Sequence, residues 1–109
     1  MSAHLLIRRD GEIIQYVGFN QRAWHAGLSN YQGRENCNDF SIGIELEGTE
    51  VISYTTAQYQ QLAVVIKLLW QYYPALHKTH ITGHSDIAPQ RKTDPGDSFN
   101  WSELWRLLK

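Results

Sequence analysis

The chain has 109 residues, 42% of them hydrophobic, and its formal net charge is −1. This length and apolar content predict one domain over residues 1–109 with a core of its own. The near-neutral charge argues against nucleic acid or an anionic membrane as a partner, and no apolar run approaches the roughly 18 residues of a membrane helix. The single cysteine, Cys37, excludes an internal disulfide and favours a reducing, cytoplasmic setting.

Two strands are predicted first, at residues 4–9 and 12–17, joined at Asp10-Gly11. Asp-Gly is a strong signal for a two-residue hairpin turn. Residues 18–38 follow as a long loop rich in Gly, Asn and Gln. Trp24 and His25 lie in this loop, and an aromatic ring beside a histidine suits the wall of a ligand groove. Packing of Trp24 beneath the loop, with His25 in solvent, is an equal alternative.

Residues 39–47 give the clearest strand pattern. One face of this strand is apolar and consists of Phe40, Ile42, Ile44 and Leu46. The other face carries small or acidic side chains, those of Ser41, Gly43, Glu45 and Glu47. Ser41 and Gly43 leave space for another group, and Glu45 would overlook that space. The alternative is an ordinary solvent-facing strand that carries two carboxylates.

Two helices are predicted in the second half of the chain. Thr55 and Gln58 have the spacing of a capping box, and apolar residues follow at helical spacing until Pro74. Asn100 is expected to cap the second helix, whose apolar stripe consists of Trp101, Leu104, Trp105 and Leu108. With a further short strand at residues 79–82, the order of elements predicts an α/β fold in which helices cover a mixed β-sheet.

The stretch at residues 82–96 carries most of the chemistry. Its two glycines and two prolines predict an ordered loop, and loops concentrate binding and catalytic groups. His84 and Asp94 offer a nitrogen and an oxygen donor of the kind that zinc accepts, and Lys92 offers a cation to a developing oxyanion. A catalytic zinc site needs three protein ligands. The alternative is that His84 and Asp94 are solvated or cap a nearby turn.

Four segments, in order along the chain, resemble motifs of the zinc-dependent N-acetylmuramoyl-L-alanine amidases. They are residues 2–11 (SAHLLIRRDG), 23–27 (AWHAG), 41–48 (SIGIELEG) and 82–96 (TGHSDIAPQRKTDPG). Within that family the likeness is strongest to the cytoplasmic anhydro-muramoyl-L-alanine amidases of bacterial cell-wall recycling. The resemblance implies an amidase fold of the peptidoglycan-recognition type, a Zn²⁺ cofactor and a muropeptide substrate.

The resemblance also implies a role for each residue of the site. His84 and Asp94 correspond to the second and third zinc ligands. Glu45 corresponds to the acidic residue that activates the attacking water, which alternation alone does not distinguish from Glu47. Lys92 corresponds to the cation that stabilises the tetrahedral oxyanion. Trp24 and His25 are expected to line the substrate groove.

The chain departs from the family pattern at one ligand. The family's first zinc ligand is a histidine that ends a strand preceding the segments matched here, and His4, His25, His77 and His80 match no ligand position. The domain is therefore expected to be incomplete at its N-terminus and its sheet to have an open edge. The chain alone is expected to bind zinc weakly and to show little amidase activity. The alternative function is a non-catalytic module that binds peptidoglycan fragments.

Overall fold

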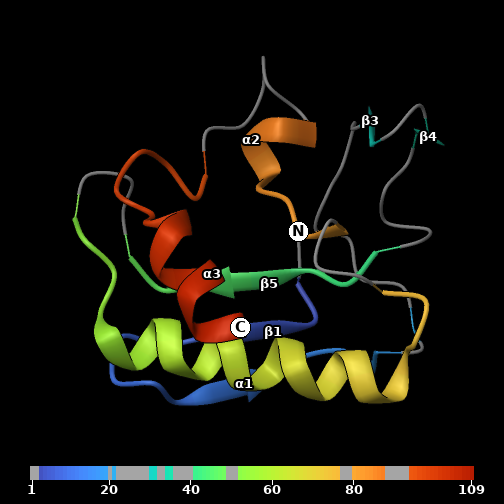
Figure 1. Ribbon diagram of the computed structural model, residues 1–109, viewed down its shortest axis with the longest axis horizontal. Helices are drawn as coiled ribbons and strands as arrows, with labels where there is room; N and C mark the ends of the chain where they lie inside the picture. The colour runs from blue at the N-terminus through green and yellow to red at the C-terminus, as the bar shows by residue number, and fades with distance from the viewer. Residues whose placement is uncertain are drawn as a thin grey trace.

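A small β-sheet and the helices packed on it position the polar groups of interest (Figure 1). The computed structural model describes residues 3–19, 21, 30–31, 34–35, 41–48, 52–76, 80–87 and 94–109. Its elements, in chain order, are β1 (Leu5–Ile7), β2 (Ile13–Gln15), β3 (Asn30–Tyr31), β4 (Arg34–Glu35), β5 (Ile44–Leu46), α1 (Thr56–Tyr72), α2 (His84–Ile87) and α3 (Trp101–Leu108).

The main sheet has the strand order β2-β1-β5. β1 pairs with β2 in antiparallel fashion, with Leu6 opposite Ile14, and with β5 in parallel fashion, with Leu6 opposite Glu45. The predicted mixed sheet is therefore confirmed. Within the described residues β5 pairs only with β1, so its other side forms an edge of this sheet.

The turn between β1 and β2 differs from the expected two-residue turn. Arg8 N donates to Glu12 O at 2.8 Å, which extends the pairing beyond Ile7 and Ile13 and leaves three residues in the loop. Gly11 N donates to Arg8 O at 2.8 Å, and Gly11 has a φ of 93°. Only glycine adopts that conformation without strain. The Asp-Gly pair thus marked the hairpin correctly but not its length, because Gly11 closes a longer loop.

β5 is shorter than predicted but has the expected faces. Ile44 and Leu46 pack against the core, whereas Glu45 between them is exposed. Ser41, Ile42 and Gly43 precede the strand without belonging to it, and residues 39–40 lie outside the described part of the chain. The alternation therefore predicted the orientation of the side chains, whereas the extent of the strand depends on its single described partner, β1.

Helix α1 has the predicted N-terminal cap. The Thr55 side chain accepts a hydrogen bond from Gln58 N, and the Gln58 side chain accepts one from Thr55 N at 2.9 Å, so both halves of the capping box are present. The helix ends at Tyr72, two residues before Pro74, because proline disfavours a helical conformation at the residue before it. The capping box and the proline therefore bounded this helix correctly.

The core lies between the sheet, α1 and α3. It is made of buried side chains from all three, namely Ile7, Tyr59, Leu62, Ala63, Ile66, Phe99, Leu104 and Leu108. Asn100 caps α3 by accepting from Glu103 N at 3.1 Å, as predicted, and Leu104 and Leu108 of the apolar stripe are almost fully buried. Each such leucine contributes about 1.5–3 kcal/mol by leaving water. α1 and α3 pack against each other, and α2 lies on the β5 side of the sheet in the view of Figure 1.

Three further predictions about elements were wrong. Of the predicted strand at residues 79–82, residue 79 lies outside the described residues, and residues 80–82 do not form a strand, because a strand needs a neighbour to pair with and no described strand pairs with them. The predicted loop at residues 82–96 contains the one-turn helix α2 near its start. The predicted loop at residues 18–38 contains the short hairpin β3–β4, in which Tyr31 lies opposite Arg34. Among the described helices, none has the length and apolarity required to cross a membrane.

Candidate functional site

The structure brings His84 and Asp94 together. His84 begins α2 and Asp94 lies ten residues further along the chain, yet Nδ1 of His84 is 3.4 Å from Oδ2 of Asp94. The His84 side chain is 13% exposed and the Asp94 side chain 55% exposed. The two donors proposed from the sequence therefore face each other at the surface, with the imidazole more buried than the carboxylate.

Backbone contacts hold the two segments that carry this pair. Ser85 N donates to Asp94 O at 2.9 Å, which ties the start of α2 to the Asp94 segment. A Cβ at Gly83 would lie 2.8 Å from Cδ of Pro95, closer than a side chain tolerates. Gly83 is therefore required for the close approach of the two segments. Asp86 stabilises the same turn, because its Oδ2 accepts hydrogen bonds from Gly83 N at 3.3 Å and from the Thr82 hydroxyl at 3.2 Å.

The spacing of His84 and Asp94 fits one zinc ion. Two ligands at about 2.0–2.2 Å from a tetrahedral zinc lie about 3.3–3.6 Å apart, and the observed 3.4 Å falls in that range. An imidazole nitrogen and a carboxylate oxygen also have the chemistry that zinc accepts. No group of three or more His, Cys, Asp or Glu suited to a metal occurs among the described residues, so these residues supply two donors and not a complete ligand set.

Glu45 and Glu47 have different environments although they lie two residues apart. Glu45 is exposed on β5, and its side chain has no hydrogen-bond or ion-pair partner in the described part of the chain. Glu47 accepts a hydrogen bond from Arg9 N at 2.9 Å and lies 3.8 Å from the Arg8 guanidinium. Glu45 is thus available to a substrate, whereas Glu47 is engaged in structural contacts.

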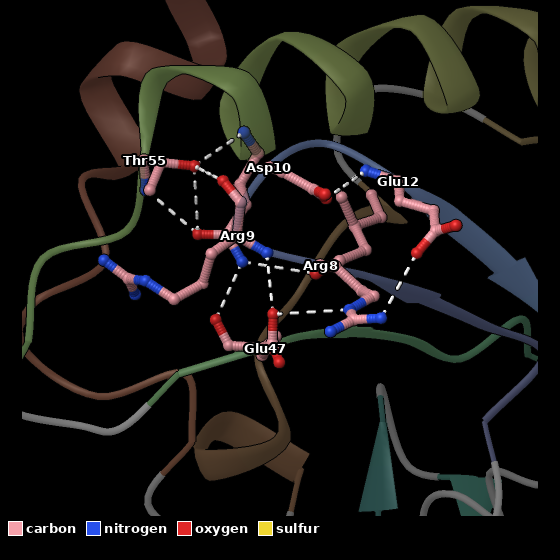
Figure 2. Close-up of polar contacts among 8 residues, drawn as sticks. Arg8, Arg9, Asp10, Glu12, Glu47 and Thr55 are labelled. Carbon is pink, nitrogen blue, oxygen red and sulfur yellow. Dashed lines mark hydrogen bonds and ion pairs between the residues drawn. The ribbon is translucent and has the colours of Figure 1, made fainter.

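Figure 2 shows the polar junction around Glu47, where β1, β5 and the start of α1 meet. Arg8 contacts Glu12 at 3.3 Å as well as Glu47, and the Thr55 hydroxyl donates to Arg9 O at 2.6 Å. The Arg9 guanidinium donates to Ser53 O at 3.0 Å through Nη2, whereas its buried Nη1 has no partner among the described residues. The Gln58 side-chain amide donates to Glu47 O at 2.8 Å, and we call this whole set of contacts the Glu47 junction.

His4 is not available to a metal. Its side chain is 1% exposed. Nδ1 accepts a hydrogen bond from Gly43 N at 3.0 Å, and Nε2 lies 2.7 Å from Gln21 O. Because Nδ1 is an acceptor, the proton is on Nε2, which donates to that carbonyl. Both nitrogens therefore bind backbone groups, and His4 joins β1 to the segment before β5.

A set of aromatic rings lies beneath the Asp94 segment. The Phe99 ring is 5.7 Å from Tyr54, 5.3 Å from Tyr59 and 4.8 Å from Trp101, centroid to centroid. The Tyr54 hydroxyl donates to Pro95 O at 2.8 Å. Tyr54 was not among the site residues predicted from the sequence. Its position just before the Thr55 cap was a usable signal, because an apolar residue there often packs near the fourth residue of the helix, here Tyr59.

The other predicted site residues, Lys92, Trp24 and His25, lie outside the described residues. A cavity of about 610 Å³ opens elsewhere, between the sheet and the second half of α1. Its lining is mostly apolar and consists of Leu5, Ile13, Gln15, Phe19, Val65, Leu68, Leu69, Tyr72 and Tyr73. This cavity contains none of Glu45, His84 and Asp94, so it is separate from the polar site.

Comparison with known proteins decides the family. The profile of the N-acetylmuramoyl-L-alanine amidases matches residues 1–97. The chain belongs to this family. One amidase relative, the 1,6-anhydro-N-acetylmuramyl-L-alanine amidase AmpD of Escherichia coli strain K12, is 68% identical over 108 residues, which are 99% of this chain and 58% of the relative. The chain thus spans about three fifths of the length of that relative.

Solved amidase structures confirm the predicted fold. A crystal structure of a selenomethionine derivative of AmpD superposes with a TM-score of 0.95 at 65% identity, covering 99% of this chain and 60% of the other. The amidase AmiD from E. coli, in complex with the substrate anhydro-N-acetylmuramic acid-L-Ala-D-gamma-Glu-L-Lys, superposes with a TM-score of 0.88 at 34% identity. The superposition covers 97% of this chain and 47% of AmiD.

Proposed function

We propose that this chain carries the catalytic residues of a zinc-dependent amidase that hydrolyses the amide between anhydro-N-acetylmuramic acid and L-alanine in peptidoglycan fragments. The observation that carries the proposal is the His84–Asp94 pair, whose 3.4 Å separation suits one zinc ion, in a chain of the amidase family. The substrate class is supported by two relatives: AmpD, whose name specifies the anhydro-muramyl-L-alanine bond, and AmiD, which was solved with a muropeptide of this type. The reaction would serve cell-wall recycling in the cytoplasm.

His84 and Asp94 would hold the metal through Nδ1 and a carboxylate oxygen. The chemistry that zinc supplies when bound is polarisation of the scissile carbonyl and a lower pKa, about 7, for a water in its shell. Because the His84 side chain is mostly buried and the Asp94 side chain is half exposed, the histidine provides a fixed donor and the carboxylate borders the space open to substrate.

Glu45 would transfer the proton. Its side chain is exposed and has no partner among the described residues. It would accept a proton from the attacking water and return it to the alanine nitrogen as the C–N bond breaks, so one carboxylate acts first as base and then as acid. The products are the free lactyl carboxylate and the free amino terminus of the peptide.

Lys92, Trp24 and His25 complete the proposed site. Lys92 would place its cation near the tetrahedral oxyanion, where opposite charge stabilises the transition state. Trp24 and His25 would line the groove, since an aromatic beside a polar ring suits a ligand that is part sugar and part peptide. These three assignments depend on the family motifs.

A chimera tests the proposed function. The 108 residues of the E. coli AmpD that align with this chain are replaced by this chain, and release of the peptide from anhydro-N-acetylmuramic acid-L-Ala-D-gamma-Glu-L-Lys is followed. We expect hydrolysis that a chelator abolishes and that zinc restores. H84A and D94A are each expected to abolish it, whereas S85A, which alters a neighbouring side chain on α2, is the matched control and should retain it.

The same assay separates the amidase from the alternative function. A folded chimera that binds the muropeptide but never cleaves it would favour a module that only binds peptidoglycan fragments. Isothermal titration with the uncleaved muropeptide distinguishes that outcome from loss of binding. Hydrolysis that persists in H84A or D94A would contradict the metal assignment.

A further inference from the structure

Tyr54 connects the rigid core to the segment that carries Asp94. Its hydroxyl donates to Pro95 O at 2.8 Å, and Pro95 directly follows Asp94. The two residues are 41 positions apart in the chain. This hydrogen bond therefore bridges the start of α1 and the proposed metal-binding segment.

The Tyr54 end of this bridge is anchored. The next residue, Thr55, caps α1 and donates through its hydroxyl to Arg9 O at 2.6 Å. The Tyr54 ring meets the Phe99 ring edge to face, with centroids 5.7 Å apart. A Cβ at Gly48 would lie 3.4 Å from Cε1 of Tyr54, so the residue two positions after β5 lies close to the same ring. The helix cap and the Phe99 ring thus hold the Tyr54 ring.

The Pro95 end of the bridge bears on the metal-binding pair. Pro95 lies close to Gly83, the residue before His84, and Ser85 N donates to Asp94 O at 2.9 Å. Any shift of the Asp94–Pro95 segment therefore changes the 3.4 Å separation between the two proposed ligands. Within the described residues, the Tyr54 hydroxyl ties this segment to the start of α1.

We propose that Tyr54 is a positioning residue for the metal site, holding Asp94 at the distance from His84 that zinc requires. This inference rests on the proposed function, because it assumes that His84 and Asp94 bind zinc. Outer contacts that orient a ligating carboxylate raise metal affinity, because the ligand is already ordered before the metal arrives. Without the hydroxyl, part of the binding free energy is used to order the Asp94 segment.

Zinc affinity of Y54F tests the inference, with Y59F as the matched control. Y54F removes only the hydroxyl and keeps the ring on Phe99. Y59F also removes one tyrosine hydroxyl next to Phe99, but that hydroxyl accepts from Asn100 N at 2.8 Å, at the cap of α3 and away from Asp94. Both variants therefore lose one hydrogen bond, and only Y54F loses a contact to the proposed ligand segment.

Zinc dissociation constants are measured for the chimera with E. coli AmpD described above, by competition with a chromophoric chelator, and far-UV circular dichroism checks that each variant is folded. We expect Y54F to weaken zinc binding about 3- to 10-fold, the effect of one net hydrogen bond. Y59F is expected to change the constant less than about 2-fold while lowering the melting temperature as much as Y54F does.

The zinc affinities of the variants decide between a positioning role and a purely structural role for Tyr54. An unchanged zinc dissociation constant in Y54F overturns the positioning role while leaving the proposed metal site intact. Equal weakening in Y54F and Y59F also overturns it, because the effect then reflects stability alone. No zinc binding by the unsubstituted chimera, or equal binding by its H84A variant, contradicts the metal assignment itself, and the role of Tyr54 falls with it.

Discussion

The Glu47 junction and the His84–Asp94 pair are both polar, but their polar groups are used differently. At the Glu47 junction, carboxylate and carbonyl oxygens accept hydrogen bonds from a backbone N–H, a hydroxyl and a side-chain amide, and these bonds join β1, β5 and the start of α1 (Figure 2). At the site, Glu45 has no partner among the described residues and Asp94 is half exposed. One region is arranged to hold three elements together, and the other leaves its charges available.

This difference indicates which changes should affect stability and which should affect chemistry. A buried polar group that loses its partner costs its full desolvation free energy, so the Glu47 junction, which includes the buried Gln58 side chain, should matter for stability. An exposed, unpaired carboxylate contributes little to folding, so Glu45 should matter for turnover alone.

The largest effect is expected from the two neighbouring glutamates. In the chimera, E45Q should lower amidase activity about 100-fold or more, the usual contribution of a general acid–base, with an unchanged melting temperature. E47Q should do the reverse, lowering the melting temperature and preserving turnover per folded molecule. Steady-state hydrolysis and thermal denaturation of both variants check this. Equal loss of activity in both would show that the sequence motif does not separate the two residues.

Gln58 should be the most sensitive position of the Glu47 junction for stability. Its side chain is fully buried, and its amide donates to Ile7 O at 3.2 Å and to Glu47 O at 2.8 Å. Q58A leaves these carbonyls without the amide and should cost about 2–4 kcal/mol. Q61A, which removes a single partly buried hydrogen bond to Gly11 O at 3.1 Å, should cost less than about 1 kcal/mol. Urea denaturation measures the free energy of unfolding of both variants. Similar losses in Q58A and Q61A would contradict the special role of Gln58.

A substitution at Gly83 should separate the two segments that carry His84 and Asp94. G83A places a Cβ 2.8 Å from Cδ of Pro95 and should destabilise the protein by about 1–3 kcal/mol, as overpacking usually does. It should also weaken zinc binding, because the Asp94 segment must move away from His84. S85A is the control and should leave both quantities unchanged. Zinc competition together with urea denaturation checks this, and a G83A chain with normal zinc affinity would show that the close approach is dispensable.

The smallest effect is expected from the exposed pair of Glu103 and Arg106 on α3. The hydrogen bond from Arg106, with Nε 3.0 Å from Oε2, lowers the pKa of Glu103. A lowered folded-state pKa gives a stabilisation that is present above the unfolded pKa and is lost as pH falls through the lowered pKa. E103Q should therefore reduce the melting temperature slightly at neutral pH and match the wild type at strongly acidic pH. A larger effect than Q58A would contradict the ranking.

Structural features that depend on contacts between neighbouring residues were predictable from the sequence alone. The Thr55–Gln58 capping box, the Asn100 cap, the stop before Pro74 and the alternation around Glu45 each involve contacts within a few residues, and all are present in the structure. The family motif also selected His84 and Asp94, which do lie together. Local propensity and spacing are sufficient for such features because the interacting groups are close in the chain.

Hydrogen bonds between residues that are far apart in the chain depend on the tertiary structure. Glu47 binds Arg9, 38 residues away, His4 binds Gly43, 39 residues away, and Tyr54 reaches Pro95 across 41 residues. No local pattern distinguishes Glu45 from Glu47 as the free carboxylate. The structure makes that distinction because packing of β1 against β5 and the cap of α1 brings Arg8 and Arg9 to Glu47.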